Sequence, residues 1–566
     1  MNQQQENNNG LSYAFAGSEK KLIGETIGEM FERIASEHPD NEALVYIPGN
    51  LRYTYREFYD ECCRAARSMM AMGVGRGDRV AIWATNHAEW VIVQFSTALI
   101  GAILVTVNPA YRVHELKYGL SDSETQTLFL IPDFKSSQYV QMLREVAPEL
   151  DSCQPGELDS KELPLLKNVV LIGGQKQPGM YSWDEFMALG ETVSDEEFQA
   201  RRADCDFDDI INVQYTSGTT GLPKGASLTH HNILNNGFFV GETMKFTSDD
   251  RLCIPVPFYH CFGMVLSNLA CVTHGATMVI PCEYFDAEKV LKAVEQEKCT
   301  ALHGVPTMFI AKLSHSDFEK FDLSTLRTGI MAGAPCPVEI MKKVNNEMNM
   351  KEVTIAYGQT ETSPVVTQTP SNDTLERRTE TVGPPLPHTE IKVISPETGK
   401  ILPIGEQGEI CCRGYQVMRG YYNKPEATAE TIDEAGWIHT GDLGRMRVDG
   451  TFQITGRIKN MIIRGGENIY PREIEEFLYT NPKIMDAQVF GVPSEKYGEE
   501  VCAWIQLQEG EEAEEQEIRD FCEGQIAHYK IPRYIMFVDE FPKTVTGKVQ
   551  KYKMRKISVK ELGLKD

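Results

Sequence analysis

The stretch RVAIWATNHAEWVIVQFSTALIGAILVTVNP, which runs from Arg79 to Pro109, decides the fold class. Residues 79–86 and 102–109 are short, apolar and rich in β-branched side chains, as is typical of buried strands. The residues between them have the pattern of a helix. A strand, a helix and a second strand in succession predict layered α/β structure with parallel sheet.

The segment Trp90–Val107 also has about the length that can span a bilayer. Gln94, Ser96 and Thr97 interrupt its apolar run, and the turn-forming sequence NPAY follows it. We therefore interpret the segment as a buried helix that leads into a buried strand, and we expect no transmembrane segment.

The alternation of helical and strand patterns begins near residue 25 and continues beyond this stretch. It predicts an α/β fold with a large N-terminal domain, over residues 25–458, of layered and mostly parallel sheets with helices. Residues 1–24 start with a polar run that lacks the pattern of a signal peptide, and they are expected to form a disordered lead-in. Residues 459–566 predict a small, mobile α+β C-terminal domain.

Composition limits the classes of function. The chain has 566 residues and a formal net charge of −25, which argues against a surface that binds nucleic acid or anionic membranes. A nucleotide site would have to reverse this charge locally. The fourteen cysteines include no C-x-x-C, so neither a zinc site nor a disulfide framework is indicated, and reduced thiols in the cytoplasm are expected.

The sequence TSGTTGLPKG, from Thr216 to Gly225, combines hydroxyls, glycines and one lysine, which together can wrap an anion closely. It does not match G-x-x-x-x-G-K-[ST]. A Walker loop opens a helix, whereas IINVQY and GASLTH on either side of this stretch both read as strands. We interpret it as a phosphate cradle, with a hairpin loop that binds nothing as the alternative.

Three other stretches carry groups that suit a nucleotide. AYGQTETSP places Tyr357 to stack on a planar ring, Thr360 to donate to phosphate and Glu361 to offer Mg²⁺ a hard oxygen. HTGDLG presents Asp442 after a tight turn, where its carboxylate could accept from both hydroxyls of a ribose, and TVTGK places Lys548 behind a glycine. The alternatives without a nucleotide are an exposed loop carboxylate for Glu361, an Asx turn for Asp442 and a solvated lysine for Lys548.

Five motifs in order, YTSGTTGLPKG, AYGQTETSP, GWIHTGDLG, GRIKNMIIRGGENIYPREIE and FPKTVTGK, resemble those of the AMP-forming acyl-CoA synthetases. The resemblance extends from about residue 25 to the end of the chain. It implies that a carboxylate attacks the α-phosphate of Mg·ATP, which gives an acyl-adenylate and pyrophosphate, and that the thiol of coenzyme A then displaces AMP. Gly456–Arg457, in place of an Asp-Arg pair, is closer to the medium-chain-like branch.

The resemblance also implies roles for individual residues. Lys548 would bridge the carboxylate and the α-phosphate in the first step, Thr360 and Glu361 would take part in catalysis, and Glu361 would hold Mg²⁺. The implied ATP-binding residues are Thr216, Ser217, Gly218, Thr219, Thr220, Gly221, Lys224, Gly333, Ala334, Pro335, Tyr357, Gly358, Thr360, Asp442, Arg457 and Lys548.

Two further sets of positions follow from the resemblance. Lys459 stands at the hinge on which the C-terminal domain swings between the two steps. Gly465 and Gly466 would line the coenzyme A tunnel, since residues without side chains leave room for a narrow passage.

The acid pocket is implied by PVPFYHCFGM, in which Tyr259 and His260 would wall the carboxylate site beside Gly358. His260 is also the fourth implied catalytic residue, with a hydrogen-bonded core histidine as the alternative. No Asp or Glu occurs between Arg251 and Cys282, so a substrate ammonium would find no partner there. The sequence therefore predicts an acid without an α-amine, most simply a fatty acid.

The predicted enzyme is thus a fatty-acyl-CoA synthetase, with ATP and coenzyme A as co-substrates and Mg²⁺ as cofactor. It is expected to act in the cytoplasm and to bind no nucleic acid. The sequence leaves a homodimer open. Alternatives are a ligase for aromatic or other acids, an enzyme that loads a carrier protein, a non-catalytic nucleotide-binding regulator, and a phosphotransferase or ATPase. The presence of Glu361, Asp442, Arg457 and Lys548 disfavours the regulator.

Overall fold

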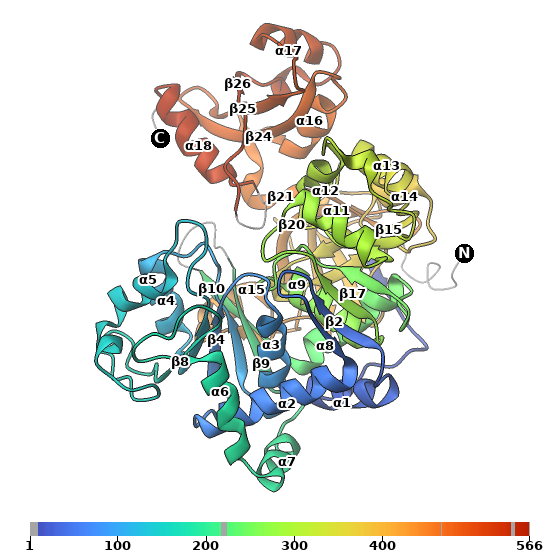
Figure 1. Ribbon diagram of the computed structural model, residues 1–566. Coiled ribbons are helices and arrows are strands. Elements are labelled where there is room, and N and C mark those ends of the chain that lie inside the picture. The colour runs from blue at the N-terminus through green and yellow to red at the C-terminus, as the bar shows by residue number, and fades with distance from the viewer. Residues whose placement is uncertain (1–9, 217–222, 335, 466, 545–548, 565–566) are drawn as a thin grey trace. The chain divides into compact units, whose positions relative to one another are not determined.

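The computed structural model describes residues 10–216, 223–334, 336–465, 467–544 and 549–564 (Figure 1). The chain divides into two compact units. The larger unit comprises Phe15–Glu390 and Cys412–Ile438, and the smaller one comprises Met1–Ala14, Ile391–Cys411 and His439–Asp566. The domain boundary at residues 458 and 459 stays a prediction.

The stretch that begins at Arg79 folds as predicted. Strand β4 (Arg79–Trp83) is followed by helix α3 (Ala88–Ile100) and strand β5 (Ile103–Thr106), and the two strands pair in parallel. Twelve of the thirteen side chains of α3 are buried, because the helix is apolar on all sides and packs inside the unit. None of the described helices combines the length and apolar character that crossing a membrane requires.

Two eight-stranded sheets organise the larger unit. The first has the order β19-β10-β9-β5-β4-β6-β7-β8, and its other strands are β6 (Thr127–Leu130), β7 (Asn168–Leu171), β8 (Tyr181–Ser182), β9 (Ile210–Thr216), β10 (Lys224–Thr229) and β19 (Gly420–Tyr421). The second has the order β16-β15-β14-β13-β11-β12-β2-β3, with β2 (Glu42–Tyr46), β3 (Leu51–Thr54), β11 (Arg251–Cys253), β12 (Thr277–Ile280), β13 (Ala301–Leu302), β14 (Thr328–Ala332), β15 (Glu352–Gly358) and β16 (Val365–Gln368). Both sheets are mostly parallel in their interiors, as predicted.

Helices connect the strands of these sheets (Figure 1). Several start at capping boxes, in which a Ser or Thr side chain and a Glu side chain satisfy the first free backbone N–H groups; Thr26 and Glu29 form one at the start of α1. The principal helices are α1 (Ile27–Glu37), α2 (Tyr55–Ala71), α4 (Val113–Asp122), α5 (Tyr139–Val146), α6 (Trp183–Leu189), α7 (Asp195–Ala203), α8 (His230–Thr243), α11 (Ala287–Gln296), α12 (Pro306–Leu313), α13 (Val338–Glu347), α14 (Leu375–Glu380) and α15 (Pro425–Thr431).

The smaller unit holds two sheets. One has the order β1-β17-β18-β20-β21, with β1 (Tyr13–Phe15), β17 (Thr389–Ile394), β18 (Gly408–Gly414), β20 (Ile438–Met446) and β21 (Phe452–Arg457). The other is built from β22 (Ile462–Arg464), β23 (Glu467–Ile469), β24 (Ile484–Ser494), β25 (Gly498–Leu507) and β26 (Tyr534–Phe537), with α16 (Pro471–Leu478), α17 (Glu515–Cys522) and α18 (Lys551–Glu561). Pro471 starts α16 because its missing N–H is not needed there.

The start of the chain differs from the expectation of a disordered lead-in. Ser12 donates its backbone N–H to the carbonyl of Leu402 at 2.7 Å, and its own carbonyl accepts from Val393 at 2.9 Å. The segment then continues as β1. The prediction is therefore wrong for the described residues 10–24, because pairing at the edge of a sheet satisfies a backbone whose side chains alone give no strong signal.

Candidate active site

The predicted phosphate stretch leaves one strand and enters the next, as its sequence context indicates. β9 and β10 pair antiparallel with Thr216 opposite Lys224, and the Thr216 hydroxyl donates to the Lys224 carbonyl at 3.3 Å. The predicted residues Ser217, Gly218, Thr219, Thr220 and Gly221 lie outside the described residues. The hairpin context agrees with a cradle that does not rely on a helix dipole.

Glu361, the proposed metal ligand, lies beside a tyrosine that sequence reasoning missed. The Tyr421 hydroxyl donates to Glu361 Oε1 at 2.8 Å, and the Lys224 ammonium lies 5.0 Å from the centre of the same ring. Burial raises the pKa of Tyr421, with the Glu361 carboxylate as the second cause, so the phenol remains a donor at ordinary pH. Tyr421 thus joins the phosphate hairpin to the loop of Glu361.

The segment around β19 contacts both the phosphate hairpin and the loop of Glu361. Tyr421 pairs with Ala226 of β10, so its position is fixed relative to the phosphate hairpin. On the other side, the Met418 N–H donates to the Glu361 carbonyl at 2.9 Å, and the Ser363 hydroxyl donates to the Gln416 carbonyl at 2.7 Å. These hydrogen bonds restrict the loop without using the Glu361 carboxylate.

The carboxylate oxygens of Glu361 suit Mg²⁺ as ligands. Oε1 accepts from Tyr421, and the structure gives Oε2 no hydrogen-bond or ion-pair partner among the described residues. A carboxylate oxygen left open beside a phosphate hairpin is the hard ligand that Mg²⁺ prefers, together with water and substrate phosphates.

The predicted adenine slot lies at the ends of two neighbouring parallel strands. β14 and β15 pair from Thr328 to Ala332, so Gly333 and Ala334 follow one strand where Tyr357 lies next to the end of the other. Such an edge is a common ligand site in open α/β sheets. Gly333 has φ +86°, a conformation that favours glycine. Pro335 lies outside the described residues.

Gly358 has a packing reason to be glycine. A Cβ atom built there would lie 1.7 Å from the carbonyl oxygen of Pro364. The close approach of the backbone therefore explains this residue without reference to the acid pocket, and its place in that pocket stays a prediction.

The predicted wall of the acid site is largely buried. Tyr259 is 9% exposed, Phe262 6% and Cys261 0%, and Cys261 donates to Gln214 Oε1 of β9 at 3.0 Å. Burial raises the pKa of Cys261, with the carboxylate of Glu361 as the next cause, which relates this wall to the Glu361 loop. His260 Nδ1 accepts from the Phe262 N–H at 3.2 Å. This bond caps a short helix, so one nitrogen of His260 serves local structure.

The smaller unit carries the predicted ribose ligands. Asp442 and Arg457 lie opposite one another on β20 and β21, and Arg457 Nε lies 2.8 Å from Asp442 Oδ1. Asp442 lies within β20, where the preceding Gly441, with φ +69°, bends the strand locally; contrary to the expectation, no separate tight turn precedes it in the described chain. The carboxylate is 5% exposed, and Arg457 orients it.

The remaining predicted residues lie further along the same unit. Lys459 is exposed on a short turn between β21 and β22. Gly465 has φ +59° in the turn between β22 and β23, which gives it a backbone reason to be glycine. Gly466 and Lys548 lie outside the described residues.

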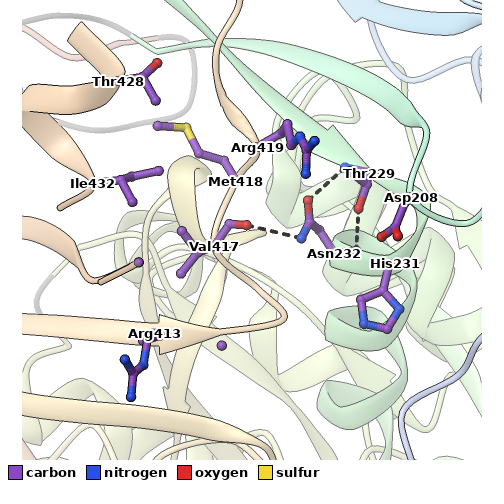
Figure 2. Close-up of a pocket in the computed structure, with 12 residues that line it drawn as sticks. Asp208, Thr229, His231, Asn232, Arg413, Val417, Met418, Arg419, Thr428 and Ile432 are labelled. Carbon is purple, nitrogen blue, oxygen red and sulfur yellow. Dashed lines mark hydrogen bonds between the residues drawn. The ribbon is translucent and has the colours of Figure 1, made fainter. Parts of the chain in front are cut away.

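A pocket of about 490 Å³ in the larger unit contains none of the predicted residues (Figure 2). It lies near the start of α8, where Asn232 accepts from Thr229 and donates to the Val417 carbonyl. Two arginines line it, but Arg413 is already bound to Glu390 by two hydrogen bonds of 2.9 Å. We therefore do not assign substrate binding to this pocket.

The large unit of mixed sheets and helices, followed by a C-terminal part, is the fold of adenylate-forming enzymes. Residues 31–422 match the AMP-binding enzyme family and residues 473–548 match the AMP-binding enzyme C-terminal domain, so the chain belongs to this family. It is an AMP-forming acid–CoA ligase, which activates a carboxylic acid with ATP and then forms a thioester with coenzyme A. The enzyme class predicted from the motifs is confirmed.

Relatives cover nearly the whole chain. The putative acyl-CoA synthetase YngI of Bacillus subtilis (strain 168) is 53% identical over 544 residues, which are 96% of this chain and 99% of the relative. The mitochondrial medium-chain acyl-CoA ligase ACSF2 of Danio rerio is 45% identical over 98% of this chain and 91% of the relative.

Solved structures resemble the chain over a similar extent. ATP-bound MatB from Rhodopseudomonas palustris is 28% identical with a TM-score of 0.81, over 94% of this chain and 99% of that structure. The anthranilate CoA ligase AuaEII in complex with anthranoyl-AMP is 25% identical with a TM-score of 0.85, over 96% and 99%. The predicted fold class, a large N-terminal domain of mixed sheets and helices with a C-terminal domain, is confirmed.

Proposed function

We propose that the enzyme activates a medium-chain fatty acid. The carrying observation is the wall around Tyr259 and Phe262, which is buried and has no Asp or Glu anywhere between Arg251 and Cys282. An unpaired ammonium would be strongly destabilised there, whereas an alkyl chain gains about 0.8 kcal/mol for each CH₂ that it buries. The similarity to the medium-chain acyl-CoA ligase ACSF2 supports the medium chain length.

In this proposal three groups of residues bind and orient ATP. The hairpin from Thr216 to Lys224 holds the outer phosphates, Tyr357 packs on adenine, and Asp442, oriented by Arg457, accepts from the ribose hydroxyls. When bound to Glu361, Mg²⁺ would neutralise phosphate charge. Support comes from the proximity of Lys224, Tyr421 and Glu361 and from the ion pair of Asp442 with Arg457.

The two steps then use different parts of the smaller unit. Lys548 stabilises the charge that gathers between the carboxylate and the α-phosphate, and it withdraws as Lys459 acts as the hinge. Gly465 and Gly466 leave space for the pantetheine arm of coenzyme A. His260 and Thr360 complete the acid and phosphate contacts.

The substrate proposal is tested by measuring pyrophosphate release, with and without coenzyme A, over straight-chain acids of graded length, aromatic acids and amino acids. We expect kcat/KM to rise with chain length to a maximum at medium length, and amino acids to be inactive. A higher kcat/KM for benzoate or anthranilate than for every alkyl acid would overturn the proposal in favour of an aromatic-acid ligase.

Replacing Tyr421 with phenylalanine tests the contact with Glu361. Loss of a hydrogen bond to a carboxylate corresponds to about 1.5–3 kcal/mol, so we expect kcat/KM for ATP to fall by about ten-fold or more and the half-saturating Mg²⁺ concentration to rise. The measurement is pyrophosphate release at varied Mg²⁺ and fixed free ATP.

The neighbouring variant Tyr422→Phe is a matched control, because the Tyr422 hydroxyl donates to Glu124 and not to Glu361. It should leave the Mg²⁺ dependence unchanged. Identical Mg²⁺ curves for Tyr421→Phe and the parent enzyme would remove Tyr421 from metal binding.

We also propose that the enzyme acts in the cytoplasm, where its fourteen cysteines, none of which forms a disulfide in the structure, would stay reduced. A homodimer stays a prediction, and light scattering of the full chain tests it.

A further inference from the structure

Three metal-ligating side chains meet in the smaller unit, although they are distant in sequence. Glu409 and Cys411 are two positions apart on β18, so the period of the strand places them on one face. His439 lies on β20, the neighbouring strand of the sheet. Glu409 and Cys411 are buried, and the His439 side chain is 35% exposed.

The three ligand atoms converge on one point. Glu409 Oε2 lies 3.0 Å and Cys411 Sγ lies 3.6 Å from the same nitrogen, His439 Nδ1, and all three atoms are within 4.8 Å of one another. His439 Nδ1 can donate a proton to the carboxylate or, when it carries none, ligate a metal ion. A cation among the three atoms would satisfy them together.

We propose that Glu409, Cys411 and His439 bind a divalent transition-metal ion of the zinc type. Thiolate, imidazole and carboxylate are its usual protein ligands. Tetrahedral bonds to zinc of the usual lengths separate N from S by about 3.6 Å and N from O by about 3.3 Å. Two of the observed separations, 3.6 and 3.0 Å, differ from these values by at most a few tenths of an ångström, and the third, between carboxylate oxygen and sulfur, is within 4.8 Å.

The surroundings of the cluster match those of a metal site. Glu409 Oε1 accepts from the Gly441 N–H at 3.1 Å, which restrains the carboxylate and leaves Oε2 to face His439. The Thr440 hydroxyl donates to the Ile410 carbonyl at 2.6 Å and ties the two strands together beside the cluster. With three protein ligands, a fourth ligand such as water would complete a tetrahedral site.

The metal would act on the segment that carries Asp442. Gly441, which Glu409 holds, directly precedes Asp442, and the Asp442 N–H donates to the Thr440 hydroxyl. Binding of the ion at the start of β20 would therefore restrict the backbone of the proposed ribose ligand. The proposed metal site is independent of the proposed fatty-acid substrate, because none of its three ligands has a role in binding the acid, ATP or coenzyme A.

Co²⁺ is a direct probe, because a thiolate bound to Co²⁺ gives a near-ultraviolet charge-transfer band that imidazole and carboxylate ligands do not. The full-length enzyme, freed of metal by a chelator and kept reduced by a phosphine, is titrated with Co²⁺ and the absorbance recorded. We expect saturation at one equivalent, displacement by Zn²⁺, and a higher thermal unfolding temperature with Zn²⁺.

The matched variants are Cys411→Ser and Cys412→Ser. Cys412 is adjacent on β18 and equally buried, but it points to the opposite face. Cys411→Ser should abolish the band, His439→Ala should weaken Co²⁺ binding at least ten-fold, and Cys412→Ser should change neither. Absence of the band in the parent enzyme, or its persistence in Cys411→Ser, would overturn the proposal whatever the stability of the variants.

Discussion

Replacing Lys548 with alanine is expected to lower pyrophosphate formation by about a hundred-fold to a thousand-fold, the effect of removing one charge-stabilising group from a transition state. The first step brings a carboxylate against a triphosphate, within a chain whose formal net charge is −25. A cation placed where negative charge gathers therefore has a large effect. Thioester formation from supplied acyl-AMP starts after that charge has left with pyrophosphate, so it should be largely retained.

Both half-reactions can be measured on the same preparation, with pyrophosphate release for the first and loss of coenzyme A thiol for the second. Lys543→Ala is a suitable control, since it removes an exposed lysine from the same part of the chain. Equal losses in the two half-reactions of Lys548→Ala would contradict the division of labour between the steps.

The fold could be predicted where the residues of a single element show its structure by their own pattern. The segment of α3 is mostly apolar, but polar residues interrupt it and strand patterns flank it, which favours a buried helix between buried strands over a membrane span; the structure has that arrangement. The two strands that contain Thr216 and Lys224 could likewise be predicted from the pattern of their own residues. The order of the motifs then supplied the enzyme class, which no single motif could.

Pairings between distant residues could not be predicted in this way. The hydrogen bond from Tyr421 to Glu361 joins positions sixty residues apart, and nothing in the strand that contains Tyr421 indicates its partner. The β1 pairing was missed because three residues, Tyr13–Phe15, are too few to show the alternation of a strand. An aromatic residue next to the glycine of a short strand is the one signal that could have drawn attention to Tyr421.

Lys312 is a second case in which tertiary structure overrides the sequence pattern. A lysine near the end of a short helix usually faces water, but Lys312 of α12 is 0% exposed. Its ammonium nitrogen lies 4.0 Å from the centre of the Phe309 ring and has no hydrogen-bond partner among the described residues. Burial lowers the pKa of Lys312 from 10.5 to about 7, against the smaller opposing effects of Cys253 and Cys282.

Replacing Lys312 with methionine is therefore expected to stabilise the larger unit by about 4 kcal/mol at pH 7, since one pKa unit corresponds to 1.36 kcal/mol. Between pH 7 and about 10.5 the unfolded chain holds the Lys312 proton and the folded chain does not, so the stability of the parent rises with pH. The methionine variant lacks this gain, and its advantage should shrink by about 2–3 kcal/mol from pH 7 to pH 9.

Calorimetry of the full chain at both pH values provides the measurement. For a unit of this size, 4 kcal/mol corresponds to a rise of about 4–5 °C in the unfolding temperature. Lys343→Met, which changes an exposed lysine on α13, is the matched control and should leave the unfolding temperature nearly unchanged at either pH. The cost of burying the Lys312 ammonium changes with pH, whereas the packing of the side chain does not. If the stability gained by Lys312→Met is the same at pH 7 and pH 9, improved packing and not the buried charge is responsible.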